Sequence, residues 1–276
     1  MSRTAPRRTS ALVSANLFDM KLRAMRRHRA FRTGPATFLY ERAFEDVLER
    51  LGSVNRRLES VLLVGVPVAD WPQRLRDVAT SVTCIDPGAG FAKAAGGLQA
   101  IEDQLDVRPG SFDLCVAIGT LDTVNDLAGA LLRLRLSLKP DSLLIGAMSG
   151  GDTLPRLRHA MRAADSVTGG ASPHVHPRID APALAQLLAA AGFDMPVIDI
   201  DRVRVAYRSL RKLIGDLRAM GATNVLTSRS RSPLTRNALA AAEKAFGREA
   251  DQSRTTETFE LLHFAAWTPP AAAARG

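Results

Sequence analysis

Two acidic side chains are spaced along the chain as they would be in a nucleoside site. Asp86 ends an apolar segment about twenty positions after a strand–helix turn, where an acid can accept hydrogen bonds from ribose hydroxyls. Glu102, followed by Asp103, precedes the next apolar segment, where an acid can accept a hydrogen bond from an adenine amino group. The other interpretation of Asp86 is a structural role in the turn that Pro87 and Gly88 form.

The turn that would face such a ligand contains a single glycine. It has the sequence GVPVAD over residues 65–70, in which Gly65 is followed by Val66, Pro67 and Val68. Pro67 has no N–H to donate, and the two valines are bulky. The turn therefore matches neither a dinucleotide-binding fingerprint nor a P-loop, whereas a nucleoside without phosphates makes smaller demands on it.

Two histidines lie in a segment rich in Gly and Pro. His174 and His176 are two residues apart, so on an extended segment their side chains point to opposite faces. One interpretation adds Asp152 or Asp180 to make a two-histidine, one-carboxylate iron site. The other is a histidine that orients the loop or contacts a substrate. We favour the second interpretation and predict no metal site. The chain also lacks an HExxH motif, a Ser-His-Asp elbow and a CxxC pair, which excludes the common hydrolase and zinc-site classes.

Apolar runs alternate with helical patterns over most of the chain. A continuous apolar run over residues 61–66 indicates a strand buried on both faces of a parallel sheet, and further strands are predicted at 81–85, 112–118 and 143–148. Helical patterns cover residues 36–51, 125–138, 181–191, 207–220 and 233–246, and further strands are expected at 197–207 and 257–267. The alternation predicts a doubly wound α/β sheet with helical additions at both ends.

We expect one domain over residues 16–267, with its core at about 58–205. Residues 1–15 and 268–276 have the composition of disordered ends. The two cysteines, Cys84 and Cys115, both lie in apolar runs and predict buried, reduced thiols in a reducing compartment. No apolar run reaches the roughly 18 residues that a transmembrane helix needs.

The net charge of +9 is concentrated at the N-terminus. Residues 1–40 carry nine Lys or Arg and one acidic residue, and the rest of the chain is close to neutral. A basic arm of this kind suits an acidic partner, a membrane surface or simple solubility, and nucleic acid is not favoured. Phe18, Leu22 and Met25 recur at helical spacing, which predicts a short basic amphipathic helix. One interpretation is a helix that docks through these residues and exposes its arginines, and the other is a lid or a partner-binding element.

Several motifs resemble those of class I S-adenosylmethionine (SAM) methyltransferases. FDL at residues 112–114 and LKPD at 138–141 occur in many such enzymes. IGAMSGGDTLPRLR at 145–158, SPHVHP at 172–177 and MGATN at 220–224 are more specific. They resemble the branch that contains the mitochondrial assembly factor of respiratory complex I (NADH:ubiquinone oxidoreductase) and its alphaproteobacterial relatives.

The resemblance implies a Rossmann-like, mostly parallel sheet of seven strands whose last strand is antiparallel. It also implies SAM as cofactor, held by Gly65, Asp86, Glu102 and the end of the fourth strand at Ala117 and Ile118. Two features depart from the family pattern. Pro67 and Ala69 replace glycines of the first turn, and residues 122–123 (Asp-Thr) replace a His-Trp pair.

The function that the resemblance implies is methyl transfer to a protein side chain, linked to assembly of complex I and to modification of an arginine. A complex I subunit is then the expected partner. Asp152, as an alternative to capping a helix, would hold a cationic group such as a guanidinium, and His174 is the second candidate catalytic side chain. The degenerate glycine turn leaves a second hypothesis, a non-catalytic assembly or binding protein on the same fold. The expected location is the bacterial cytoplasm or, if the N-terminus is a transit peptide, the mitochondrial matrix.

Overall fold

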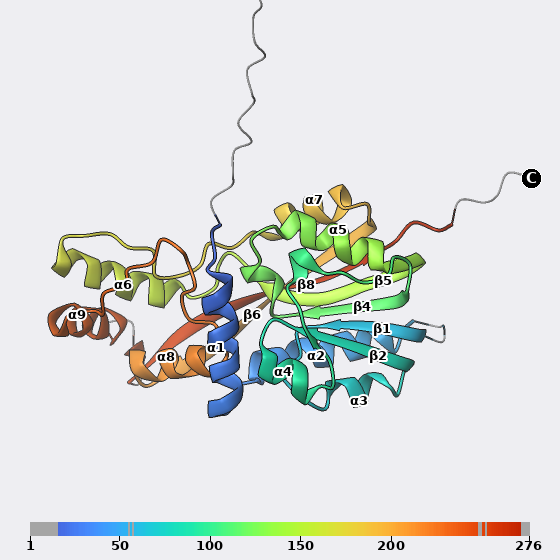
Figure 1. The fold of residues 1–276 in the computed structure, drawn as a ribbon. Coiled ribbons are helices and arrows are strands. Elements are labelled where there is room, and N and C mark those ends of the chain that lie inside the picture. The colour runs from blue at the N-terminus through green and yellow to red at the C-terminus, as the bar shows by residue number, and fades with distance from the viewer. Residues whose placement is uncertain (1–15, 55, 57, 248–249, 252, 272–276) are drawn as a thin grey trace, which may run out of the picture.

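A single mixed sheet forms the centre of the molecule (Figure 1). The structure is a computed structural model that describes residues 16–54, 56, 58–247, 250–251 and 253–271. The strand order is β3-β2-β1-β4-β5-β8-β6, and β8 is antiparallel to both of its neighbours. The strands are β1 (Leu58–Val64), β2 (Ala79–Asp86), β3 (Leu98–Gln99), β4 (Phe112–Ile118), β5 (Leu138–Ser149), β6 (Asp194–Tyr207), β7 (Ala250–Asp251) and β8 (Arg254–Trp267). The predicted seven-stranded, doubly wound sheet with an antiparallel last strand is thereby confirmed, and the short β7 adds a hairpin to β8.

Helices cover both faces of the sheet. The described helices are α1 (Met20–Thr33), α2 (Phe38–Leu51), α3 (Trp71–Leu75), α4 (Ala89–Ala94), α5 (Leu127–Ser137), α6 (Pro155–Thr168), α7 (Ala181–Ala190), α8 (Leu210–Ala219) and α9 (Arg236–Gly247). The apolar sides of α5 and α7 pack on one face of the sheet, and those of α2 and α3 pack on the other. In Figure 1 the first pair lies above the strands and the second pair lies below them. Because helices cover both faces of the central strands, residues 61–64 of β1 and 114–118 of β4 are continuous apolar runs.

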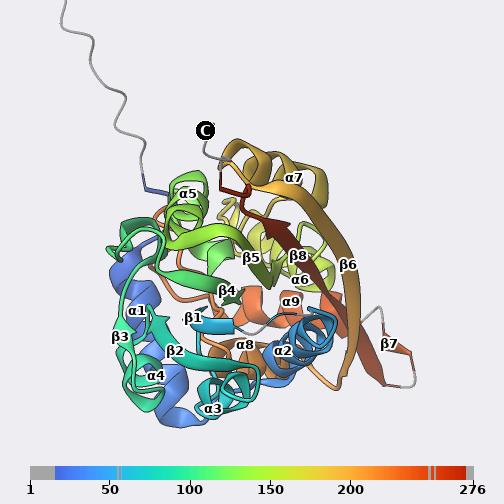
Figure 2. The ribbon, with the colours of Figure 1, turned by 90° about the vertical axis from the view of Figure 1, so that its right-hand side faces the viewer.

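The helices on the two faces of the sheet form two hydrophobic cores with it, and a third hydrophobic core lies beyond the end of the main sheet. β5 pairs with β8 only up to Leu261, whereas β6 and β8 continue together as far as Tyr207 and Thr255 (Figure 2). Helices α6, α8 and α9 pack around this extension through residues such as Leu213 and Phe259. Of the expected helical additions, the C-terminal helices α8 and α9 thus belong, with α6, to a separate hydrophobic core.

The predicted orientation of the first helix is wrong. Arg23, Arg27 and Ala30 are its buried residues, whereas Met25 is 66% exposed. Phe18 is buried, but it precedes the helix, which begins after Asp19 caps it by accepting a hydrogen bond from the Leu22 N–H at 3.0 Å. The arginines are buried because two buried carboxylates compensate their charge. The spacing of apolar residues alone cannot predict such ion pairs.

The C-terminal boundary also differs from the expectation. Thr268 is buried, and its N–H donates to the carbonyl of Ser142 at 2.8 Å, so the chain remains anchored past β8. The expected disorder of residues 1–15 and 272–276 lies outside the described residues. Among the helices of the described ranges, none has the length and apolar character that crossing a membrane requires.

Candidate functional site

The carboxyl ends of β1 and β4 meet at the point where the strand order reverses. Gly65 follows β1 with φ +83°, and a Cβ there would lie 2.3 Å from the carbonyl oxygen of Ile118. Only glycine combines this backbone conformation with such a close approach. Ala117 and Ile118 are fully or nearly fully buried on β4 beside it. Three of the predicted cofactor residues thus lie together at one edge of the sheet.

Asp86 ends β2 at the same edge and is fully buried. Its Oδ1 accepts hydrogen bonds from Gly88 N–H at 2.7 Å and from Arg27 Nε at 2.9 Å. Its Oδ2 accepts from Val66 N–H at 2.9 Å and from Arg27 Nη2 at 2.5 Å. Burial acts to lower the pKa of Arg27, but the charge and hydrogen bonds of Asp86 outweigh it and raise that pKa overall.

Glu102 lies in a short 3₁₀ turn after β3 and is also fully buried. Both terminal nitrogens of Arg23 donate hydrogen bonds to its carboxylate, one to each oxygen at 2.8 Å. The same guanidinium donates to the carbonyl of Thr120 at 2.6 Å and to the hydroxyl of Thr123 at 3.0 Å. The two acids predicted for a nucleoside therefore both bind arginines from α1.

Helix α1 is seated closely over this edge. A Cβ at Gly88 would lie 2.8 Å from the Arg27 Cβ, and one at Gly90 would lie 2.4 Å from the Phe31 ring. The Arg27 guanidinium also stands 5.3 Å from the centre of the Phe91 ring. Sequence reasoning missed both arginines. The available signal was their spacing of four residues, which places them on one helix face opposite two acids.

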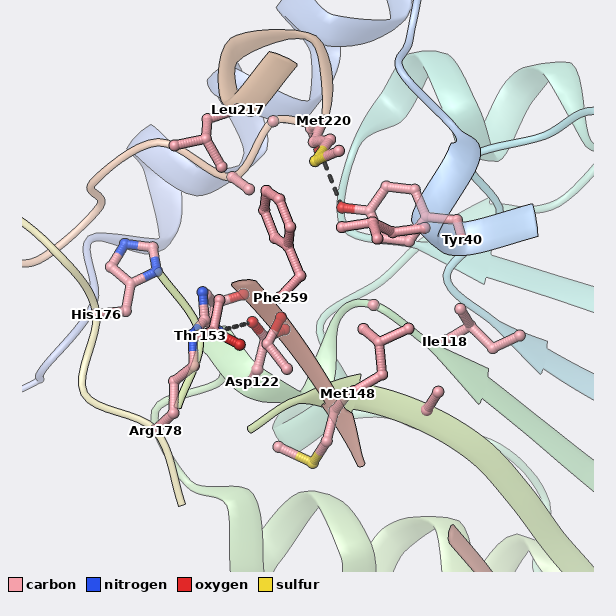
Figure 3. A pocket seen from close by; sticks show the side chains of 18 of the residues that line it. Tyr40, Ile118, Asp122, Met148, Thr153, His176, Arg178, Leu217, Met220 and Phe259 are labelled. Atoms are coloured by element: carbon pink, nitrogen blue, oxygen red, sulfur yellow. Dashed lines mark hydrogen bonds and ion pairs between the residues drawn. The ribbon is translucent and has the colours of Figure 1, made fainter. Parts of the chain in front are cut away.

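A pocket adjoins this edge at the carboxyl ends of β4 and β5 (Figure 3). It holds about 780 Å³ of space, part of it open to solvent. Met148, Phe259 and Leu217 supply apolar walls, and Tyr40 donates a hydrogen bond to the carbonyl of Met220 at 3.2 Å. Its walls therefore come from the sheet, from α2 and from the third core.

The charged residues that line this pocket are Arg23 and Arg27 of α1 and a buried ion pair from later in the chain. Arg178 donates to Asp122, and both side chains are largely buried. Burial acts to raise the pKa of Asp122, but the charge and hydrogen bond of Arg178, together with the nearby His176 and Arg23, lower that pKa overall, so the carboxylate stays ionised. The Nε of Arg178 is buried and has no partner among the described residues. The position where the family has a His-Trp pair thus carries a paired aspartate.

The structure separates the two histidines. The Nε2 of His176 accepts a hydrogen bond from Val225 N–H at 2.9 Å, and the buried ring lines the pocket. Burial, with the nearby Arg178, lowers its pKa to about 4, so the ring is neutral at pH 7. His174 instead pairs with Asp165 of α6, with 2.8 Å between Nε2 and Oδ1, outside the pocket. The structure does not bring the predicted candidate His174 to the site.

Asp152 is likewise outside the pocket. Its side chain is 73% exposed and lies 3.4 Å from Arg202. The predicted capping of α6 by Asp152 is wrong, because Glu257 of β8 accepts the hydrogen bonds of the Arg156 and Leu157 N–H groups at 3.2 and 2.8 Å. No group of three or more His, Cys, Asp or Glu side chains in the described part of the chain is arranged to hold a metal ion.

Comparison with known proteins agrees with this architecture. A family model described as "Methyltransferase domain" matches residues 36–196, which is more than half of the chain. The chain belongs to the methyltransferase domain family. The expected membership of the class I methyltransferases is thereby confirmed. The match begins after α1, so the helix that binds the two acids lies outside the shared region.

Two groups of curated proteins are similar to this methyltransferase-domain chain. The mitochondrial arginine-hydroxylase NDUFAF5 of Danio rerio is 35% identical over 62% of this chain and 54% of its own length. Its Homo sapiens counterpart is 29% identical over 96% of this chain and 81% of its own. The malonyl-[acyl-carrier protein] O-methyltransferase of Laribacter hongkongensis is 33% identical over 66% of this chain and 59% of its own. The chain spans about half the length of the Danio rerio and Mus musculus relatives.

Solved structures show the same fold at low sequence identity. The YcgJ protein of Bacillus subtilis is 10% identical with a TM-score of 0.56, and the match covers 80% of this chain and 97% of that one. The 1,6-didemethyltoxoflavin-N1-methyltransferase of Burkholderia thailandensis is 16% identical with a TM-score of 0.52, covering 95% and 93%. These likenesses establish the methyltransferase fold and leave the chemistry of the site to its own residues.

Proposed function

We propose that the chain is a SAM-dependent methyltransferase that modifies a protein substrate. The observation that carries this proposal is the pair of fully buried carboxylates, Asp86 and Glu102, beside Gly65 at the switch point of the sheet. Both carboxylates accept hydrogen bonds from arginines of α1, and the hydroxyls and amino group of an adenosine moiety are donors that could take the place of those arginines. Bound SAM would supply a methyl group made electrophilic by its sulfonium charge.

The residues present fit the nucleoside half of this cofactor. Asp86 would accept from the ribose and Glu102 from the adenine, once these acids are released from Arg27 and Arg23. Gly65 allows backbone to approach a ligand closely, although Pro67 contributes no N–H to the amino-acid half. The turn therefore offers fewer donors than the family pattern, and we expect the carboxylates to contribute most of the binding.

The adjoining pocket is the expected substrate site. It opens beside Ile118 and Gly119, at the end of β4. The buried Arg178 Nε offers a fixed donor to an oxygen of the substrate, and the Asp122 carboxylate fixes the orientation of that guanidinium. Neutral His176 adds no charge. These groups would position an acceptor atom, which is the main requirement that methyl transfer makes on an enzyme.

The relatives support a substrate carried on a protein. One group is named for arginine hydroxylation in mitochondria, and the other for methylation of a malonyl group on acyl-carrier protein. With the resemblance of the IGAMSGGDTL block, this favours a subunit of respiratory complex I as the substrate. The corresponding locations are the bacterial cytoplasm or the mitochondrial matrix.

A second candidate function is a non-catalytic assembly protein on this fold. The observation that favours it is the binding of both acids by arginines of the same chain, together with Pro67 in the turn. In that case the arginines take the place of a cofactor, and the fold serves as a binding scaffold.

Calorimetric titration of the full chain with SAM and with its demethylated product, S-adenosylhomocysteine, tests the proposal. We expect saturable heat and a rise in the thermal unfolding midpoint. Asp86→Asn should weaken binding at least tenfold, because the neutral amide cannot accept as strongly from ribose hydroxyls. The matched control Asp126→Asn changes an exposed helix cap that does not line the pocket, and this variant should bind as wild type does. Absence of heat and of any thermal shift at millimolar ligand would defeat the enzyme hypothesis and leave the scaffold.

A further inference from the structure

Helix α1 occupies the nucleoside end of the site with two arginines. We propose that α1 is an internal strap that keeps this end closed, and that an adenosine-bearing ligand enters only when the strap is displaced. The inference rests on the proposed function, because it names how access to that same site is regulated. The strap consists of residues 20–33, and its contacts with Asp86 and Glu102 are the closed state.

Asp86 has no free acceptor position in the closed state. A carboxylate offers about four lone-pair positions. Arg27 uses two of them, and the N–H groups of Val66 and Gly88 use the other two. The backbone donors are fixed parts of the fold, so a ribose can bind only by replacing Arg27. Glu102 is fully buried and holds Arg23 through both oxygens, so an adenine amino group faces the same competition.

The strap excludes a ligand by its backbone as well as by its charge. Arg27 contacts Gly88 through its Cβ and Gly221 through its Cα, at positions where an added Cβ would lie within 2.8 and 3.2 Å. Phe31 covers Gly90 in the same way. Rotation of the two arginine side chains would therefore leave the helix over the ends of β2 and α4. Opening requires that the helix itself move.

The connections of the strap suit such a movement. Its outer face is open, with Met25 and Arg29 exposed. At its C-terminal end, Gly34 has φ +92°, and no atom lies within 4 Å of the position that a Cβ would take, so this glycine is suited to act as a hinge before α2. At its N-terminal end, Asp19 N–H donates to Val225 and Phe18 forms a bridge to Leu226. The C-terminal end of the strap is therefore joined through a glycine, whereas backbone hydrogen bonds hold its N-terminal end.

Hydrogen exchange of the full chain tests the strap without any mutation. Saturating S-adenosylhomocysteine should speed exchange of the amides of residues 22–33 at least tenfold, and should slow exchange around Asp86 and Glu102. The opposite result, in which a bound ligand leaves the α1 amides as protected as before or protects them further, would overturn the proposal.

Variants of the strap supply the second measurement. Arg27→Met removes the competitor of the ribose and should tighten S-adenosylhomocysteine binding at least tenfold in calorimetry. Arg27→Lys keeps the charge but loses the bidentate geometry, so it should fold and show a smaller gain, which covers the case in which Arg27→Met fails to fold. Arg29→Met, on the exposed face of the same helix, is the matched control and should bind as wild type does.

The outcomes separate the two proposals. If wild type and the Arg27 variants bind with equal affinity, the strap is refuted and the methyltransferase proposal stands. If no folded variant binds, both proposals fail together. If Arg27→Met and Arg29→Met tighten binding equally, the gain is a general effect of lost positive charge, and the strap is again refuted.

Discussion

Replacing Gly65 by alanine tests whether close approach at the switch point requires this glycine. A non-glycine residue in the left-handed region costs about 1–2 kcal/mol, and φ at Gly65 is +83°. The added Cβ would also lie 2.3 Å from the Ile118 carbonyl oxygen and 2.8 Å from the Thr120 methyl carbon. Relieving overlap of this kind in a packed interior costs about 1–3 kcal/mol more. Gly65→Ala should therefore lower the free energy of unfolding by about 2–5 kcal/mol.

Gly96→Ala is the matched control for this substitution. Gly96 has φ +66°, but no atom lies within 4 Å of the position its Cβ would take. Gly96→Ala should therefore lower the free energy of unfolding only by the cost of the left-handed backbone, about 1–2 kcal/mol. Urea denaturation followed by circular dichroism measures the free energy of unfolding of both variants. We expect the slope of that free energy against urea concentration to be the same as in wild type. If the two variants lose the same free energy of unfolding, close approach to the Ile118 carbonyl is not the reason that the turn after β1 has a glycine at position 65.

Three further predictions concern buried ionisable groups. Arg178→Met should lower the unfolding free energy by about 3–5 kcal/mol, because it leaves the Asp122 charge buried and unpaired, and adding Asp122→Asn should restore most of the loss; denaturation curves that show no restoration would contradict this. The folded pKa of His176, about 4, lies below its ordinary value of 6.5, so the unfolded state binds the extra proton as pH falls. The stability that neutral His176 provides is present above pH 6.5 and is lost toward pH 4, by about 3 kcal/mol relative to His176→Gln, in urea titrations at several pH values. Burial raises the pKa of the Cys84 thiol to about 11 and raises that of Cys115 as well, so a thiol reagent at pH 8 should label neither until denaturant is added.

The sequence allowed the sheet and one edge of the site to be predicted for a simple reason. Strands buried on both faces of a parallel sheet are rich in apolar residues, so the apolar segments of β1, β2, β4 and β5 predict strands. Their carboxyl ends must meet at one edge. Residues at those ends, such as Gly65 and Asp86, were therefore expected to lie together before any contact was known.

The partners of those residues could not be predicted, because they come from distant parts of the chain. Arg27 binds an acid 59 positions away, and periodicity alone assigned it to the solvent. Arg178 lies 56 positions from Asp122, and no local pattern links them. Asp152 showed the converse error. A local capping rule favoured it, but Glu257, about a hundred residues later, provides the hydrogen bonds.

The extension of β6 and β8 past the main sheet has a thermodynamic consequence. We expect it to give the chain two neighbouring cooperative units, because one hydrophobic core is built on the sheet and another on α6, α8 and α9. Met148 contributes to the pocket from the first unit, and Leu217 and Phe259 contribute from the second. A molecule bound between them would stabilise the docking of the units by mass action, and the association of the units would in turn set its affinity.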